Sequence, residues 1–191
     1  MILIRYLFWG WFFAAIATGH FLLLQRLPPP AIPVLIFIQV TVLLAAYFRV
    51  PAFHEWVERF SLRTLVLLHV TRFVGFYFLT LYARGQLPYA FAVPGGYGDI
   101  IVAALALLVA LVPMSAALRE RAFSIWNVVG LVDILLVVFT AARLGLADPM
   151  AMRALTYLPL SLLPTFLVPL IIATHVVIYL RLNRAKDPQA G

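Results

Sequence analysis

Six long runs of apolar residues divide the sequence, with short polar segments between them. Each run approaches or exceeds the roughly 20 residues that an α-helix needs to cross about 30 Å of hydrocarbon. The runs lack the alternation with period two that a lipid-facing strand shows. Backbone groups in lipid must satisfy their own hydrogen bonds, so we predict one transmembrane helix per run. The runs are Ile2–Leu24, Ile32–Phe48, Leu62–Tyr82, Ile100–Leu118, Ser124–Leu144 and Ala154–Leu180.

The first run also resembles a signal peptide. Arg5 precedes an apolar stretch that contains the small-x-small sequence Ala15-Ile16-Ala17, a pattern typical of a cleavage site. The apolar character continues to Leu24, which favours an uncleaved first helix. If cleavage did occur, five helices would remain and the amino terminus would lie outside.

Two of the segments between the runs have a character of their own. Residues Pro51–Ser61 are amphipathic, with aromatic and charged residues on opposite faces of a helix, so we predict a short helix in the headgroup layer between the second and third transmembrane helices. Residues Arg84–Gly98 are rich in glycine and proline and predict a loop. Asp99 then stands where it would cap the start of the fourth helix.

The composition of the chain also indicates a membrane protein. The chain has 191 residues, of which 65% are hydrophobic and only 11% are charged, whereas a soluble domain carries roughly a quarter charged residues. The chain has too few charged residues to cover a water-facing surface, so we predict that most of its surface faces the lipid bilayer. The net charge of +7 does not indicate nucleic acid as a partner, because the arginines lie between the apolar runs, where cytoplasmic loops collect them.

The distribution of Lys and Arg predicts the orientation of the bundle. One set of connectors and ends carries nine of these residues, and the other set carries four. The first set consists of Arg5, Arg49, Arg59, Arg63, Arg119, Arg121, Arg181, Arg184 and Lys186, and the second of Arg26, Arg84, Arg143 and Arg153. The positive-inside rule then places both termini in the cytoplasm. We predict one six-helix domain over residues 1–182 and a disordered cytoplasmic tail over residues 183–191.

The residue inventory excludes several kinds of chemistry. The chain has no cysteine, which rules out disulfides, thiolate catalysis, Cys-ligated zinc and iron–sulfur clusters. Lys186, the only lysine, lies in the tail, so a retinal Schiff base has no site within the membrane. Ser161 is more than three helical turns from His175, which argues against a Ser-His-Asp triad. We therefore predict no catalytic residues and expect a role other than that of an enzyme.

Four ionisable residues within the runs are the candidates for function. At 1.5 Å per residue, His69 lies about 9 Å and Arg72 about 14 Å into the third helix. On the same scale, His175 lies about 9 Å and Asp133 about 14 Å from the cytoplasmic ends of the sixth and fifth helices. Equal depth predicts an Arg72–Asp133 ion pair between the third and fifth helices, which relieves the cost of burying either charge alone.

The neighbours of these residues indicate a polar centre between the third, fifth and sixth helices. Spacing of three and four places His69, Arg72, Phe76 and Thr80 on one inward stripe of the third helix. The prolines of the sixth helix, among them Pro164 and Pro169, are expected to kink it and to free carbonyl groups there.

Three functional interpretations fit this centre. In the first, His69, Arg72, Asp133 and His175 form a ligand or proton site in a binding or transport protein for a small molecule or lipid. In the second, His69 and His175 are axial ligands of haem b in a membrane electron carrier, the only setting in which they would bind a metal. In the third, the polar centre is purely structural, in a membrane subunit or assembly factor. Zinc lacks a sufficient set of ligands here, and the oligomeric state is not predicted.

Two-thirds of the chain also resembles a known group of proteins. The resemblance rests on Arg72…Gly75…Phe78-Leu79…Gly85…Leu87-Pro88…Phe91-Ala92…Pro94…Gly98-Asp99, on Trp126-Asn127…Gly130-Leu131…Asp133, and on Phe166-Leu167-Val168-Pro169-Leu170…His175. These motifs are similar to those of small uncharacterised bacterial multi-pass membrane proteins. The resemblance implies a single six-helix domain in a bacterial cytoplasmic (inner) membrane. The group has no assigned activity, so the resemblance transfers no catalytic role.

Overall fold

The computed structural model describes residues 2–186, which form eight α-helices and no strand. The helices are α1 (Ile2–His20), α2 (Ala31–Arg49), α3 (Pro51–Glu58), α4 (Leu62–Leu68), α5 (Gly75–Ala83), α6 (Tyr89–Leu111), α7 (Ala116–Ala147) and α8 (Val168–Lys186). A 3₁₀ segment, His69–Val74, joins α4 to α5, and a π-helical segment, Leu163–Leu167, leads into α8. The predicted all-α fold is confirmed.

Six helical stretches are long and apolar enough to cross a membrane. They are Ile2–His20, Ala31–Arg49, Leu62–Ala83, Tyr89–Leu111, Ala116–Ala147 and Leu163–Arg184. The third combines α4, the 3₁₀ segment and α5, and the sixth combines the π-helical segment with α8. Length and composition therefore support six spans, as the apolar runs predict.

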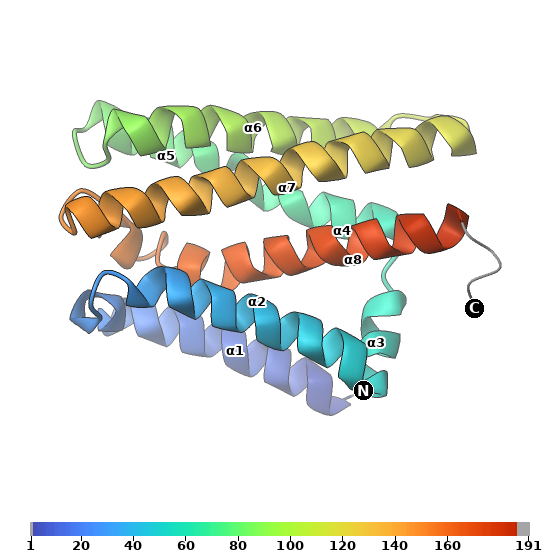
Figure 1. Ribbon diagram of the computed structural model, residues 1–191, viewed down its shortest axis with the longest axis horizontal. Helices are drawn as coiled ribbons and strands as arrows, with labels where there is room; N and C mark the ends of the chain where they lie inside the picture. The colour runs from blue at the N-terminus through green and yellow to red at the C-terminus, as the bar shows by residue number, and fades with distance from the viewer. Residues whose placement is uncertain (1, 187–191) are drawn as a thin grey trace.

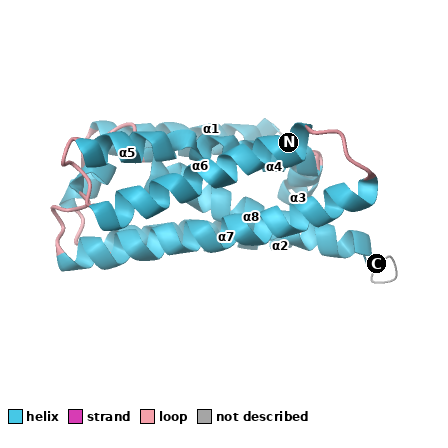
Figure 2. Ribbon diagram, turned by 90° about the horizontal axis from the view of Figure 1, so that it is seen from above, coloured by secondary structure: helices cyan, strands magenta, loops and turns pink. Residues whose placement is uncertain are grey.

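The spans run back and forth, so that α1 begins and α8 ends at the same end of the bundle, together with α3 (Figure 1). The connectors after α1, α5 and α7 lie at the opposite end (Figures 1 and 2). The sixth span is the central one. It is 72% buried over its most apolar window, compared with 11% for each of the first two spans, and α8 contacts α2, α4 and α7.

Side chains from two neighbouring helices satisfy the backbone where prolines interrupt the sixth span. Pro169 has no N–H, so the carbonyls of Thr165 and Pro164, four and five residues earlier, receive no bond from it. The indole N–H of Trp11 donates to the Thr165 carbonyl at 2.9 Å, and the amide of Gln39 donates to the Pro164 carbonyl at 3.1 Å. Irregular backbone at this depth is thus covered by protein rather than by lipid.

The start of the fourth transmembrane helix was predicted wrongly. The sequence predicts a loop over Arg84–Gly98 and a helix over Ile100–Leu118, whereas α6 begins at Tyr89 and ends at Leu111. The turn is confined to the residues around Gly85, which has a φ of 68°. Asp99 is consequently not an N-cap but a buried residue in the interior of α6, 3% exposed.

A close contact between two helices explains why this glycine-rich stretch is helical. A Cβ atom on Gly75 of α5 would lie only 2.3 Å from the carbonyl oxygen of Gly96 on α6, and a Cβ on Gly96 would lie 3.0 Å from the Gly75 carbonyl. Small residues at a helix crossing let the backbones approach in this way. The packing gained at the crossing outweighs the poor intrinsic helix propensity of glycine.

The predicted short helix between the second and third spans is present as α3. Glu58, its last residue, accepts a hydrogen bond from the Tyr47 hydroxyl at 2.6 Å and forms ion pairs with Arg184 at 3.0 Å and Arg181 at 3.2 Å. These contacts attach α3 to α2 and α8. Helix α8 continues to Lys186, four residues into the segment predicted as a tail. The remainder of that segment, residues 187–191, lies outside the described residues.

Candidate functional site

The 3₁₀ segment determines which side chains of the third span face inward. Buried residues recur at every third position through this span, namely at His69, Arg72, Gly75, Phe78 and Leu81. A 3₁₀ helix has three residues per turn, so His69 and Arg72 lie directly above one another, and the buried residues of α5 continue this face. The predicted stripe is therefore wrong beyond Arg72, because Phe76 and Thr80 are exposed.

Arg72 lies at the centre of the bundle with its side chain 1% exposed. Its Nε donates to Oδ1 of Asp99 at 2.7 Å, and its Nη1 donates to the carbonyl of Gly130 at 2.9 Å. Its Nη2 donates to Oδ2 of Asp133. The structure thus brings Arg72 and Asp133 together and adds Asp99 from α6, which the sequence analysis missed. We call Arg72, Asp99 and Asp133 the arginine cluster.

Asp99 was missed because its helix was predicted to start too late. With α6 beginning at Tyr89, Asp99 lies ten residues, or about 15 Å, from the end of the bundle opposite the termini. Arg72 lies eleven residues, or about 16 Å, from the same end, where α5 stops at Ala83. The sequence signal that could have identified Asp99 was a second carboxylate, besides that of Asp133, at the depth of the Arg72 guanidinium. The third, fourth and fifth spans therefore supply the arginine cluster, rather than the third and fifth alone.

The arginine cluster contains more negative than positive groups. One guanidinium faces two carboxyl groups, which gives a net charge of −1 when both carboxyls are ionised. The side chain of Asp99 is 4% exposed and that of Asp133 is 22% exposed. A charge buried in a low-dielectric interior needs a partner, so the second carboxylate is incompletely compensated by Arg72.

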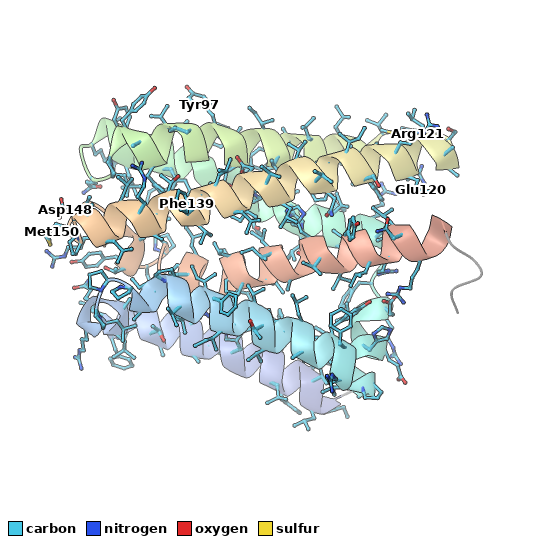
Figure 3. The ribbon with its side chains drawn as sticks, in the orientation of Figure 1. Tyr97, Glu120, Arg121, Phe139, Asp148 and Met150 are labelled. Carbon is cyan, nitrogen blue, oxygen red and sulfur yellow. The ribbon has the colours of Figure 1, made fainter. Side chains whose placement is uncertain are left out.

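A cavity of about 560 Å³ ends on this cluster. Its walls are apolar residues of α2, α7, the π-helical segment and α8, and its lining extends from the connectors opposite the termini inward to Arg72 and Asp99. Met150, which Figure 3 labels in the connector after α7, lines the outer part. This is the size and character of a site for a drug-sized ligand, an apolar cavity with a few polar groups.

The two candidate histidines also meet, one layer away from the arginine cluster. The ring centroids of His69 and His175 are 4.2 Å apart, and both residues are fully buried. The Trp126 ring packs against both, with centroid distances of 4.9 Å to His69 and 5.4 Å to His175. We call His69, His175 and their partners Asn127 and Thr174 the histidine layer. Neither imidazole lines the 560 Å³ cavity, whereas Thr174 lines a second, apolar cavity of about 300 Å³.

Hydrogen bonds fix the tautomer of each imidazole. The Asn127 side-chain amide donates to the backbone carbonyl of His175 at 3.0 Å, which leaves its Oδ1 to accept from Nδ1–H of His175 at 2.8 Å. The Thr174 hydroxyl donates to the Ile171 carbonyl and so accepts from Nε2–H of His69 at 3.2 Å. Nδ1 of His69 and Nε2 of His175 therefore keep unprotonated lone pairs, and neither atom has a hydrogen-bond partner within residues 2–186.

This geometry does not fit the haem interpretation. Axial ligation by two histidines requires a porphyrin plane between the two rings. The rings of His69 and His175 are in direct contact, so no porphyrin can lie between them. Across the described residues, no group of three or more His, Cys, Asp or Glu side chains is arranged to hold a metal ion.

Gly130 of α7 connects the two layers. Its carbonyl accepts the bond from Arg72, and its α-carbon packs directly on the ring of His175. A Cβ atom at this position would lie 2.7 Å from Cε1 of His175. The position of the guanidinium therefore depends on the packing of the histidine layer beneath it.

Residues 29–183 match the sequence profile of a family described as "Domain of unknown function (DUF8737)". The chain belongs to this family. The DUF8737 domain contains every residue of the arginine cluster and of the histidine layer, whereas α1 precedes it. This agrees with the resemblance to proteins without assigned activity, while bacterial origin stays a prediction. No curated protein and no solved structure matches the chain.

Proposed function

We propose that this chain is a multi-pass protein of a bacterial cytoplasmic membrane that binds a small amphipathic molecule in the cavity above the arginine cluster. The end of the bundle that holds both helical termini carries nine Lys and Arg residues against four at the other end, which supports cytoplasmic termini. In this orientation α3 lies at the cytoplasmic surface and the cavity extends from the periplasmic connectors. The ligand would enter from that side or from the adjacent leaflet.

The observation that carries this proposal is an apolar cavity that ends on a buried ion pair. A clamp between helices needs tight packing around it, and the 560 Å³ of space beside Arg72 and Asp99 serves no such purpose. A ligand with an apolar body and a polar end matches both parts of the cavity. The apolar body would pack against the walls formed by α2, α7 and α8, and the polar end would bond to the cluster and so determine the orientation of the ligand.

Arg72 and Asp99 keep hydrogen-bonding capacity for such a ligand. Arg72 uses three of its five N–H donors on the protein, which leaves two. Asp99 accepts from Arg72 through Oδ1, and no described residue bonds to its Oδ2. His69 and His175 act in this proposal as positioning residues, because they support Gly130 and through it the guanidinium. A transport role would require Arg72 to release Asp99 or Asp133 when the ligand binds and to pair with it again when the ligand leaves.

Two tryptophan substitutions on α7 test the proposal. Val138 lines the cavity, whereas Val132 is 52% exposed on the outer surface of the same helix and does not line it. Native mass spectrometry of the detergent-purified protein should show a bound lipid-like molecule in the wild type and in Val132→Trp. Val138→Trp fills the cavity and should remove it. Equal retention in both variants would show that the molecule binds elsewhere, and no bound molecule in any sample would favour a purely structural cluster.

A further inference from the structure

We propose that the cavity takes a lipophilic cation and that this cation exchanges with one proton. The inference names the ligand class and therefore rests on the proposed function. Two independent observations support it, namely the charge balance of the arginine cluster and the aromatic rings in the cavity wall.

The charge balance selects against an anion. Arg72 facing ionised Asp99 and Asp133 gives a net charge of −1, which an anionic ligand would increase to −2. A monovalent cation brings the sum to zero, and so does one proton. Oδ2 of Asp99, which no described residue bonds to, is the acceptor that a ligand cation would meet at the inner end of the cavity.

The cavity wall offers a second attraction for a cation. Phe78 and Phe91 both line the cavity, and their ring centroids are 5.1 Å apart. The face of an aromatic ring attracts a desolvated cation, and this attraction is strongest away from water. A large cation with apolar substituents could therefore contact the rings and the aliphatic walls while its charge is balanced by Asp99.

The other charged groups near the site do not change this balance. His69 and His175 face the cluster from the third and sixth spans, and each imidazole bonds only to an uncharged side chain, Thr174 or Asn127. Arg153 also lines the cavity, but it is an exposed residue in the outer connector, where water and salt screen its charge. The excess negative charge thus remains at the buried end.

Exchange follows from the same count. Without ligand, one proton on the Asp99–Asp133 pair neutralises the cluster. When the cation enters, that proton leaves to water through the cavity, so one positive charge replaces another. Binding should then weaken about tenfold for each unit that pH is lowered within the range where the free cluster holds the proton.

Tetraphenylphosphonium and tetraphenylborate test the inference, because they share size and shape and carry opposite charges. Isothermal titration into the detergent-solubilised full chain, in two buffers with different heats of ionisation, gives the affinity and the number of protons released. We expect tetraphenylphosphonium to bind with release of about one proton. Tetraphenylborate should bind at least about tenfold more weakly. Equal affinities, or binding of the cation without proton release, would overturn the inference.

Variants separate this inference from the proposed function. Asp133→Asn removes the excess charge and should abolish proton release, whereas Asp148→Asn, in the exposed connector after α7, should retain it. Val138→Trp should abolish binding of both probes. If neither probe binds even to the wild type, the cavity is not a ligand site and the proposed function fails. If both probes bind equally and are lost in Val138→Trp, the cavity is confirmed and only the cation preference is wrong.

Discussion

The arginine cluster and the histidine layer are adjacent within the bundle, yet they differ in how their polar atoms are satisfied. The arginine cluster combines a guanidinium with two carboxyl groups and borders a cavity. In the histidine layer the two imidazoles bond to the uncharged side chains of Asn127 and Thr174 and pack against Trp126. Excess negative charge beside a cavity characterises a ligand site, whereas the two imidazoles, which do not line that cavity, support the cluster from beneath.

The largest effect should come from breaking the arginine cluster. Arg72→Gln leaves the buried carboxylate of Asp99 and the half-buried carboxylate of Asp133 without their cation. Loss of one partner from a buried ion pair costs about 3–5 kcal/mol. Thermal unfolding in detergent should show this loss, while Arg84→Gln, at an exposed arginine, should not. Adding Asp133→Asn to Arg72→Gln should recover part of the stability. Strictly additive effects in this double-mutant cycle would contradict the pairing.

A smaller loss should follow when the helices that bring Asp99 to Arg72 are pushed apart. Gly75→Ala places a methyl group 2.3 Å from the Gly96 carbonyl oxygen, and overpacking of this kind costs about 1–3 kcal/mol. Gly10→Ala is the matched control, because a Cβ atom there meets nothing within 4 Å. We expect the first variant alone to lower the unfolding temperature. Equal stability of the two variants would mean that α5 and α6 do not cross closely.

Asn127→Ala tests the supporting role of the histidine layer. It removes both bonds between Asn127 and His175 and leaves a buried imidazole N–H without an acceptor, which costs about 1–3 kcal/mol. Ligand affinity measured by titration should fall but not vanish, because the layer acts on the ligand only through the position of Gly130 and Arg72. A complete loss of binding in a folded Asn127→Ala protein would show that the layer contacts the ligand itself.

The contacts of Glu58, at the end of the bundle that holds both helical termini, should have the smallest effect, because they are partly exposed to solvent. Burial tends to raise the pKa of Glu58, but the hydrogen bond from Tyr47 and the charges of Arg181 and Arg184 outweigh it and lower that pKa. A lowered pKa contributes stability above the unfolded value, and this contribution is lost as pH falls through the folded value. The protection of α3 against hydrogen exchange, corrected for the slower intrinsic exchange of amides in acid, should therefore fall as pH is lowered.

Two glutamine variants check this pH dependence. Glu58→Gln should weaken the protection of α3 at neutral pH and remove most of its dependence on acid. Glu55→Gln, on the exposed face of the same helix, should leave both unchanged. An identical acid profile in wild type and Glu58→Gln would mean that Glu58 does not attach α3 to the bundle.

The sequence predicted the number of spans because the bilayer imposes a simple rule on length and composition. Their bounds were less accurate: the fifth span begins at Ala116 rather than Ser124, and the sixth at Leu163 rather than Ala154. It failed at α6, where Gly95 and Gly96 indicate a loop by the propensities measured in water. In the folded bundle Gly96 makes a helix crossing with Gly75 instead. The local sequence around Gly96 does not show that Gly75 of another helix will pack against it. Because the start of α6 was therefore placed too late, Asp99 was left out of the predicted site.

Depth was the most useful sequence signal for the site. It placed Arg72 level with Asp133 and His69 level with His175, and the structure brings both pairs together. Depth carries no information on ring orientation or on free space, so it could not distinguish contacting imidazoles from haem ligands. The cavity likewise could not be predicted, because its lining comes from five spans whose relative rotation depends on packing.

Photolabelling in native membranes is the most direct test of a ligand site above the arginine cluster. A diazirine-bearing fatty amine, activated by light and mapped by peptide mass spectrometry, reports which residues of α7 it touches. We predict labels on the cavity-facing Ile134 and Val138 and their loss when the cavity is filled by Leu163→Trp, since Leu163 also lines it. Labels confined to the outward-facing Val132, Leu135 and Phe139 would contradict the proposal, because they would show that the probe contacts α7 only from the surrounding lipid.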